Sequence, residues 1–369
     1  MKYYLIAGEA SGDLHGANLM KAIRENDPKA EFRFWGGDKM EAVGGTLVKH
    51  YRELAFMGIQ EVVMNLGTIL KNMTFCKKEL LEYNADVVVF IDYPGFNLRM
   101  AKFAKKNGMK TVFYISPTVW AWKKSRVFTI KKYVDRMLVI LPFEQEFYQQ
   151  YDYKVYFVGH PLLDELKEEQ HLSRAGFLEK NKLPDKPVIA LLPGSRMQEI
   201  TNILSYMVKL SADFPDYQFV IGGVNSVPKE TYNVAQNLKV VFGQTHDLLR
   251  SAEAALVTSG TATLETALLG TPQVVCYKTS ALTYAVGRML VNVSFISLVN
   301  LIMKKEVVRE LLQQEFTLKN LKSELTKILS PEGRETMKSE YQKLRSLLGE
   351  SGASKKAAGV IQDFLSDTK

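Results

Sequence analysis

The sequence contains few of the residues that build disulfide frameworks or metal sites. Only two cysteines, Cys76 and Cys276, occur in 369 residues, and their separation excludes a disulfide-rich scaffold and a cysteine-based zinc site. The five histidines show no metal-ligand spacing, and no Asp-x-Asp pair occurs anywhere. We therefore expect no bound metal and no cofactor.

Long apolar segments are also absent. The longest charge-free apolar run of note, Met289–Met303, is interrupted by Asn and Ser and is shorter than the roughly 20 residues that cross a bilayer. The N-terminus enters directly as an expected strand, Tyr3–Ala7, without the charged and apolar regions of a signal peptide. These absences predict a cytoplasmic protein.

The composition is that of a globular protein with a basic surface. Hydrophobic residues make up 46% of the chain, enough for two cores in a protein of this length. The net charge of +8 fits nucleic acid, an anionic membrane surface or a phosphorylated substrate equally well. Charge alone does not choose among these partners.

Apolar strands alternate with helical segments from one end of the chain to the other. This alternation predicts an α/β fold with two Rossmann-like, doubly wound parallel sheets that face each other across a cleft. The polar stretch Asp164–Lys186 is typical of a linker with one short helix. We expect a first domain over residues 1–165 and a second over 186–334. The chain from Val307 onward is expected to be helical, and about residues 335–369 can pack back on the first domain.

The most informative stretch is Ala254–Gly270. An apolar run ends at Thr258, and a helical pattern starts after Ser259-Gly260-Thr261. A strand that breaks into a helix in this way directs free N–H groups at one point, which favours an anion such as phosphate. Glu265, one turn further, can accept hydrogen bonds from a ribose diol. An ordinary capped turn explains this stretch equally well.

A second loop of the same kind follows the strand that ends at Leu192. Gly194 and Ser195 are expected to start a helix directly after that strand, Arg196 offers a planar fork for a phosphate, and Glu199 follows. Two anion loops in one domain favour a diphosphate that carries a ribose.

The first domain offers weaker signals. The segment Gly8–Gly16 contains Glu9, Ser11, Gly12 and Asp13, and its carboxylates serve helix capping or ligand binding with equal plausibility. Asp92 ends a buried strand, where low dielectric raises a carboxyl pKa and makes a better base. A turn-starting role before Pro94 is the commoner reading of such an Asp. Two tryptophans and three cations between Trp120 and Arg126 fit base stacking, a sugar site or lipid headgroups, or a core Trp beside a solvated basic helix.

In this order, the segments resemble the lipid-A-disaccharide synthase family, a membrane-surface glycosyltransferase family of Gram-negative outer-membrane assembly. The resemblance covers nearly the whole chain and depends on seven blocks in the family's order. They are Gly8–Asp13, Phe56–Val62, Ile91–Asn97, Tyr114–Trp122, Leu141–Glu144, Leu192–Arg196 with Glu199, and Ser259–Glu265.

The resemblance implies a GT-B architecture and an inverting reaction. UDP-2,3-diacylglucosamine would react with 2,3-diacylglucosamine 1-phosphate to give a β-1,6-linked disaccharide 1-phosphate and UDP. By position, Asp92 matches the family's proposed base. On chemical grounds His15 is the second candidate for this role, and a purely structural role is the alternative for a loop histidine beside Asp13. Residues assigned to the UDP side are Gly194, Ser195, Arg196, Glu199, Ser259, Gly260, Thr261, Glu265 and Asn300.

Three positions depart from the family pattern. Gly95 stands where the family commonly has a second Asp, and Val299 and Lys305 replace its usual Pro and Arg. Asn300 is retained. These changes affect any carboxylate that assists Asp92 and the detail of the donor loop.

The expected partners include an anionic membrane surface on the inner face of the inner membrane. The apolar segment Leu54–Phe75 is a candidate membrane face, although a core helix is the commoner use of such a pattern. Its proposed membrane-facing residues are Phe56, Met57, Ile59, Val63, Ile69 and Leu70. A homodimer could form through the C-terminal helices, Phe316–Leu365.

Two other functions compete with the transferase. The first is another GT-B enzyme, such as a UDP-N-acetylglucosamine epimerase or a different lipid-acceptor transferase. The second is a basic nucleic-acid-binding protein, for which no RNA- or DNA-binding signature is present.

Overall fold

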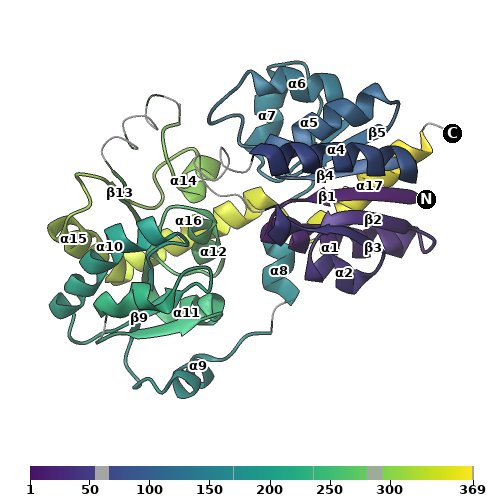
Figure 1. Cartoon of the computed structure of the whole chain (residues 1–369). Coiled ribbons are helices and arrows are strands. Elements are labelled where there is room, and N and C mark those ends of the chain that lie inside the picture. The colour runs from purple at the N-terminus through teal and green to yellow at the C-terminus, as the bar shows by residue number, and fades with distance from the viewer. Residues whose placement is uncertain are drawn as a thin grey trace. The chain divides into compact units, whose positions relative to one another are not determined.

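The computed structural model describes residues 1–54, 66–168, 170–235, 237–280, 284, 289 and 293–367. The chain forms two compact units (Figure 1). Unit 1 consists of Met1–Lys167 and Leu348–Lys369, and unit 2 of Glu168–Leu347.

In its described part, unit 1 is built on a seven-stranded parallel sheet. In spatial order the strands are β3 (Thr46–His50), β2 (Glu31–Gly36), β1 (Lys2–Ala7), β4 (Val87–Ile91), β5 (Lys110–Tyr114), β6 (Arg136–Val139) and β7 (Tyr156–Phe157). The order reverses between β1 and β4. Ligands of doubly wound sheets bind beyond the carboxyl ends of the strands at such a point.

Helices cover both faces of this sheet (Figure 1). They are α1 (Ala10–Asn26), α2 (Asp38–Val43), α4 (Leu66–Tyr83), α5 (Pro94–Lys106), α6 (Arg126–Tyr133), α7 (Phe143–Gln149), α8 (Leu162–Glu168) and α17 (Ala353–Ser366), with a 3₁₀ turn at Tyr51–Glu53. Because strand side chains alternate, Leu5 packs in the core beneath α1 and α17, while Ile6 packs in the core beneath α4 and α5. The two cores lie on opposite faces of the sheet, so its central strands are buried on both faces.

Unit 2 repeats the plan with a six-stranded parallel sheet among its described residues. The strands in spatial order are β10 (Lys239–Phe242), β9 (Gln218–Gly223), β8 (Val188–Leu192), β11 (Ala252–Thr258), β12 (Gln273–Tyr277) and β13 (Glu310–Leu312). The helices are α9 (Arg174–Asn181), α10 (Met197–Leu210), α11 (Thr245–Ser251), α12 (Thr261–Leu268), α14 (Leu298–Met303), α15 (Leu318–Leu329) and α16 (Pro331–Leu348), with 3₁₀ turns at Ser211–Asp213 and Lys229–Ala235. The predicted class of two Rossmann-like parallel-sheet domains is therefore confirmed.

Two expectations about the second half of the chain are wrong. The segment after Val307 is not wholly helical, because Glu310–Leu312 adds the edge strand β13 beside β12. The linker region holds two short helices, α8 and α9, rather than one; Ser173 caps α9 by accepting a hydrogen bond from Gly176 N–H.

The C-terminal segment belongs to both units. Helix α16 lies in unit 2 up to Leu347, whereas α17 packs against α1 in unit 1. Asp164 in α8 accepts backbone hydrogen bonds from Gly352 and Ser354, which fixes the start of α17. Ala357, Ala358 and Ile361 then complete the core beneath α1.

Candidate functional site

Unit 2 contains a pocket of about 500 Å³ at the carboxyl ends of β8 and β11. The structure brings eight of the nine residues predicted for the UDP side together in its wall. The lining residues are Leu192, Gly194, Ser195, Arg196, Glu199, Gly222, Val224, Thr245, Thr258, Ser259, Gly260, Thr261, Ala262 and Glu265. Asn300 is the predicted residue that does not line this pocket.

The β11–α12 turn forms one wall, as the sequence predicted: the strand ends at Thr258 and the helix starts at Thr261. Ser259 does not offer its side chain freely, because its Oγ donates to the carbonyl of Ile296 at 3.1 Å. The Glu265 Oε2 atom lies 3.6 Å from the Nε2 atom of the His246 ring. The N-terminus of α12 therefore faces the pocket with a carboxylate one turn behind it.

The β8–α10 loop differs from its prediction. Helix α10 starts at Met197 and not at Gly194, because neither Gly194, with its positive φ, nor the extended Arg196 has helical backbone angles. Oε2 of Glu199 accepts hydrogen bonds from the backbone N–H groups of Ser195 at 3.0 Å and Arg196 at 3.3 Å. Gly194 has a φ of +124°, and a Cβ there would lie 2.6 Å from the Glu199 side chain. Glycine is required by both conditions.

Arg196 contributes a long, positively charged side chain to the wall of this pocket. Its side chain is 77% exposed, and its guanidinium lies 3.8 Å from the Glu199 carboxylate. Such an exposed pair adds little stability. Arg196 is therefore available to a phosphate group in the pocket that it lines.

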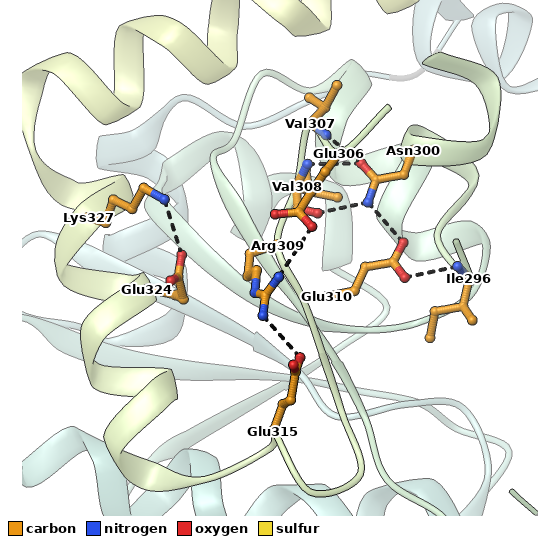
Figure 2. Close-up of polar contacts among 10 residues, drawn as sticks. All are labelled: Ile296, Asn300, Glu306, Val307, Val308, Arg309, Glu310, Glu315, Glu324 and Lys327. Atoms are coloured by element: carbon orange, nitrogen blue, oxygen red, sulfur yellow. Dashed lines mark hydrogen bonds and ion pairs between the residues drawn. The ribbon is translucent and has the colours of Figure 1, made fainter. Parts of the chain in front are cut away.

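Asn300, which does not line the pocket, joins α14 to the segment Val307–Glu310 (Figure 2). Its side-chain N–H groups donate to Val308 O at 2.8 Å and to Glu310 Oε1 at 2.9 Å. Its Oδ1 accepts from the backbone N–H groups of Val307 and Val308. The amide is fully buried and all its hydrogen-bonding positions are used, so it has none to offer a ligand.

The segment from Ile296 to Glu310 also carries two of the three departures from the family pattern, Val299 and Lys305. The Glu310 carboxylate in β13 accepts a hydrogen bond from the backbone N–H of Ile296 at 2.9 Å (Figure 2). It accepts another from the backbone N–H of Ser297, also at 2.9 Å. Val299 is buried, and Lys305 pairs with Glu340 of α16 at 2.6 Å. In this structure both departures support the fold of unit 2.

In unit 1, Asp92 lies directly after β4 in a strained conformation. Asp92 and Tyr93 have φ values of +46° and +48°, which are costly for residues other than glycine. The Asn97 side chain donates to Asp92 O at 2.7 Å and holds this turn. Burial, followed by the negative charge of Glu9, raises the pKa of Asp92 from 3.8 to about 6. A carboxyl group with this pKa is ionised at neutral pH and is a better base than a solvated Asp.

The glycine-rich loop of unit 1 divides its predicted residues between two tasks. Asp13 is buried and accepts backbone hydrogen bonds from Gly37, Lys39 and Met40. It therefore caps α2 rather than its own helix. Glu9 is the exposed N-cap residue of α1, and its side chain makes no capping bond.

The remaining residues of that loop lie within α1. Ser11 is exposed there and Gly12 is buried. The imidazole of His15 has a pKa lowered from 6.5 to about 4, mainly by burial and then by Lys39. Burial, with His15 as the second cause, also lowers the pKa of His160 to about 4. Both rings are neutral at pH 7.

Several residues at the carboxyl ends of the two sheets were not predicted from the sequence. Thr245, Val224 and His246 have no recognisable pattern in the sequence, and only the fold brings them to the pocket or to Glu265. Glu144 was noticed only within a family block. It is buried after β6, where its Oε2 accepts the backbone N–H of Leu141 at 3.0 Å, and burial raises its pKa from 4.5 to about 8.

The candidate membrane face is described only in part. Phe56, Met57, Ile59 and Val63 lie outside the described residues. Ile69 is half-buried, and Leu70 is 55% exposed on α4, with Phe75 and Leu81 also exposed on that helix. Across the described residues we find no helix long and apolar enough to cross a membrane.

Comparison with known proteins agrees with this architecture. Residues 3–364 match the family model for lipid-A-disaccharide synthetase. The lipid-A-disaccharide synthase of Syntrophus aciditrophicus is 42% identical over 96% of this chain and 95% of its own length. That of Myxococcus xanthus is 38% identical over 98% and 97%.

Solved structures show the same fold at low identity. A putative UDP-N-acetylglucosamine 2-epimerase from Listeria monocytogenes superposes with a TM-score of 0.69 at 14% identity, covering 100% of this chain and 97% of that one. The Neisseria meningitidis epimerase bound to UDP-GlcNAc gives 0.67 at 14%, covering 98% and 100%. These likenesses confirm the GT-B class, and the sequence matches identify the family. The chain belongs to the lipid-A-disaccharide synthase family.

Proposed function

We propose that this chain joins UDP-2,3-diacylglucosamine to 2,3-diacylglucosamine 1-phosphate. The products are the β-1,6-linked disaccharide 1-phosphate and UDP. The observation that supports this most is the unit 2 pocket, with Arg196 and the N-terminus of α12 in its wall, in a member of this family.

The donor diphosphate would bind in that pocket without a metal. The N-terminus of α12 contributes roughly 0.3–1 kcal/mol to anion binding when exposed and up to about 2 kcal/mol when partly buried. A charge-assisted contact from Arg196 adds about 1.5–3 kcal/mol. Glu265 would accept hydrogen bonds from the ribose hydroxyls. No group of three or more metal-ligating side chains occurs in the described ranges of the chain.

Asp92 would act as the general base. The acceptor 6-hydroxyl oxygen attacks the anomeric carbon and loses its proton to the Asp92 carboxylate. The bond from that carbon to the diphosphate oxygen breaks, its electron pair stays on UDP, and the configuration inverts. His15 is less suited to this role, because a pKa of about 4 makes it a weaker base than Asp92, whose pKa is about 6.

The acceptor and donor carry acyl chains, so we place the enzyme at the cytoplasmic face of the inner membrane as a peripheral protein. The exposed Leu70 and Phe75 of α4 supply apolar area for this contact. Neighbouring cations such as Lys71 and Lys78 would each add about 1 kcal/mol at an anionic surface. Pairing of two copies through the C-terminal helices remains part of this proposal.

The test is product analysis with purified protein in excess chelator. Incubation with both diacylated substrates should release UDP and give a disaccharide monophosphate by mass spectrometry, with a β-1,6 linkage by NMR. An activity that appears only after magnesium or manganese is restored would contradict the metal-free donor site. Conversion of UDP-N-acetylglucosamine to its 2-epimer without disaccharide would instead establish the competing enzyme.

A further inference from the structure

The junction of β11 and α12 is rich in hydroxyl groups, and most of them have acceptors. Ser259 Oγ donates to Ile296 O at 3.1 Å. Thr263 Oγ1 donates to Gly260 O at 2.8 Å, and Thr266 Oγ1 donates to Ala262 O at 2.7 Å. These three hydroxyls are satisfied inside the fold.

Thr258, the last residue of β11, is different. Its side chain is 3% exposed, and its hydroxyl oxygen is enclosed without a hydrogen-bond partner among the residues that the structure describes. A buried hydroxyl without a partner costs stability, because folding removes its hydrogen bonds to water and returns none. Valine has nearly the same shape and would avoid this cost.

The position of Thr258 indicates what the hydroxyl is for. Thr258 lines the same pocket as Gly260, Thr261 and Arg196. A rotation of about 120° about its Cα–Cβ bond moves the hydroxyl to another staggered position, and no hydrogen bond is lost because none is made. The hydroxyl can thus turn toward an acceptor in the pocket at low cost.

We propose that the Thr258 hydroxyl is a ligand-binding group that stays unpaired in the free protein and donates to a phosphate oxygen of the bound UDP-sugar. A phosphate oxygen is the expected acceptor, since the adjacent N-terminus of α12 favours an anion at this point. The inference depends on the proposed function, because it takes the pocket's occupant to be a nucleoside diphosphate.

The test is Thr258→Val, with UDP affinity measured by calorimetry and the melting temperature measured without ligand. The Kd for UDP should rise about ten- to a hundredfold, the range for a lost hydrogen bond to a charged group. The melting temperature should stay the same or rise, because the deleted hydroxyl has no partner in the free protein. Thr258→Ser keeps the hydroxyl and should recover most of the affinity.

Thr266→Val is the matched control. Its hydroxyl is buried in the same helix–strand junction, but it is bonded to Ala262 O and does not line the pocket. This variant should lose melting temperature and keep UDP affinity, the opposite of the result for Thr258→Val. The pair separates ligand binding from support of the fold.

Two results would overturn the inference. Unchanged UDP affinity in Thr258→Val, with normal binding by the wild type, would remove Thr258 from the site and leave the proposed function intact. A lower melting temperature without an affinity change would show that the hydroxyl has a partner in the fold. Failure of the wild type itself to bind UDP would contradict the donor site, and with it both proposals.

Discussion

Glu199 Oε2 accepts a hydrogen bond from the backbone N–H of Ser195 at 3.0 Å. The carboxylate therefore occupies a donor that the sequence pattern assigned to a phosphate, and it does the same at Arg196 N–H. What the β8–α10 loop still offers an anion is the guanidinium of Arg196. On the other wall of the pocket the N-terminus of α12 remains open.

Arg196→Ala should weaken UDP binding about ten- to a hundredfold, since a contact to a charged group contributes about 1.5–3 kcal/mol. Its melting temperature should hardly change, because the side chain is 77% exposed and its pair with Glu199 is long. Calorimetry with UDP measures the first quantity and thermal unfolding the second.

Arg196→Lys keeps the positive charge but loses the planar fork, so it should fall between the wild type and the Ala variant. Equal UDP affinity in all three proteins would mean that Arg196 does not contact the donor.

Asp92→Asn should lower kcat by about 10²–10⁴-fold, the range for a positioned base. Stability should not fall. The raised pKa of Asp92 means that the folded state holds its proton up to about pH 6 while the unfolded state releases it near 3.8, so ionisation at neutral pH costs stability that Asn does not incur. A stable variant with nearly normal kcat would move His15 into the role of base.

The pH profile gives an independent test of the same group. The base must be ionised in the free enzyme, so kcat/KM should fall about tenfold per pH unit below a pKa near 6. A profile that breaks near pH 4 would follow His15 instead.

Glu144→Gln should change how stability depends on pH. The buried carboxyl of Glu144 keeps its proton to about pH 8 in the folded state, whereas the unfolded chain releases it near 4.5. The unfolded state therefore binds fewer protons between these values, and wild-type stability should decline by about 1.4 kcal/mol per pH unit relative to the variant. Denaturant unfolding of both proteins at pH 5, 6 and 7 measures this difference. Parallel curves would mean that Glu144 ionises normally.

Leu70→Ser should reduce binding to anionic vesicles in a flotation assay, and high salt should release the wild type. Leu70 is 55% exposed on α4, so its replacement removes apolar contact area without opening the core. Val234→Ser in unit 2 is a matched control, because Val234 is equally exposed. Loss of binding in both variants, or binding that ignores lipid charge, would contradict a specific membrane face.

The sequence predicted the strands buried on both faces, such as Val87–Ile91 and Val188–Leu192, and also the edge strands near Val155–Gly159 and Lys239–Phe242. The strands that it missed are edges. Thr46–His50 is half-buried and mixed in polarity, and Glu310–Leu312 is three residues long and contains a carboxylate. β3 pairs with β2 and β13 pairs with β12, and neither β3 nor β13 contains a continuous apolar run that would mark it in the sequence.

The candidate site also contains one feature that the sequence predicts and another that it does not. The turn at Thr258–Thr261 was predictable, because a strand, a break and a helix follow one another within one stretch. Which side chains face the pocket was not, since that depends on hydrogen bonds across the fold. Asn300 is saturated by Val307, Val308 and Glu310, and no spacing in the sequence indicates this.

The division of the chain also orders its synthesis. Unit 2 is contiguous and is complete once Leu347 has left the ribosome, whereas unit 1 begins first and finishes last, because α17 supplies Ala357, Ile361 and Leu365 to the core beneath α1. Until then this core lacks the apolar side chains of α17. A released chain truncated shortly before Ala353 should therefore have a protease-resistant second half and a sensitive first half, because its unit 1 core lacks α17.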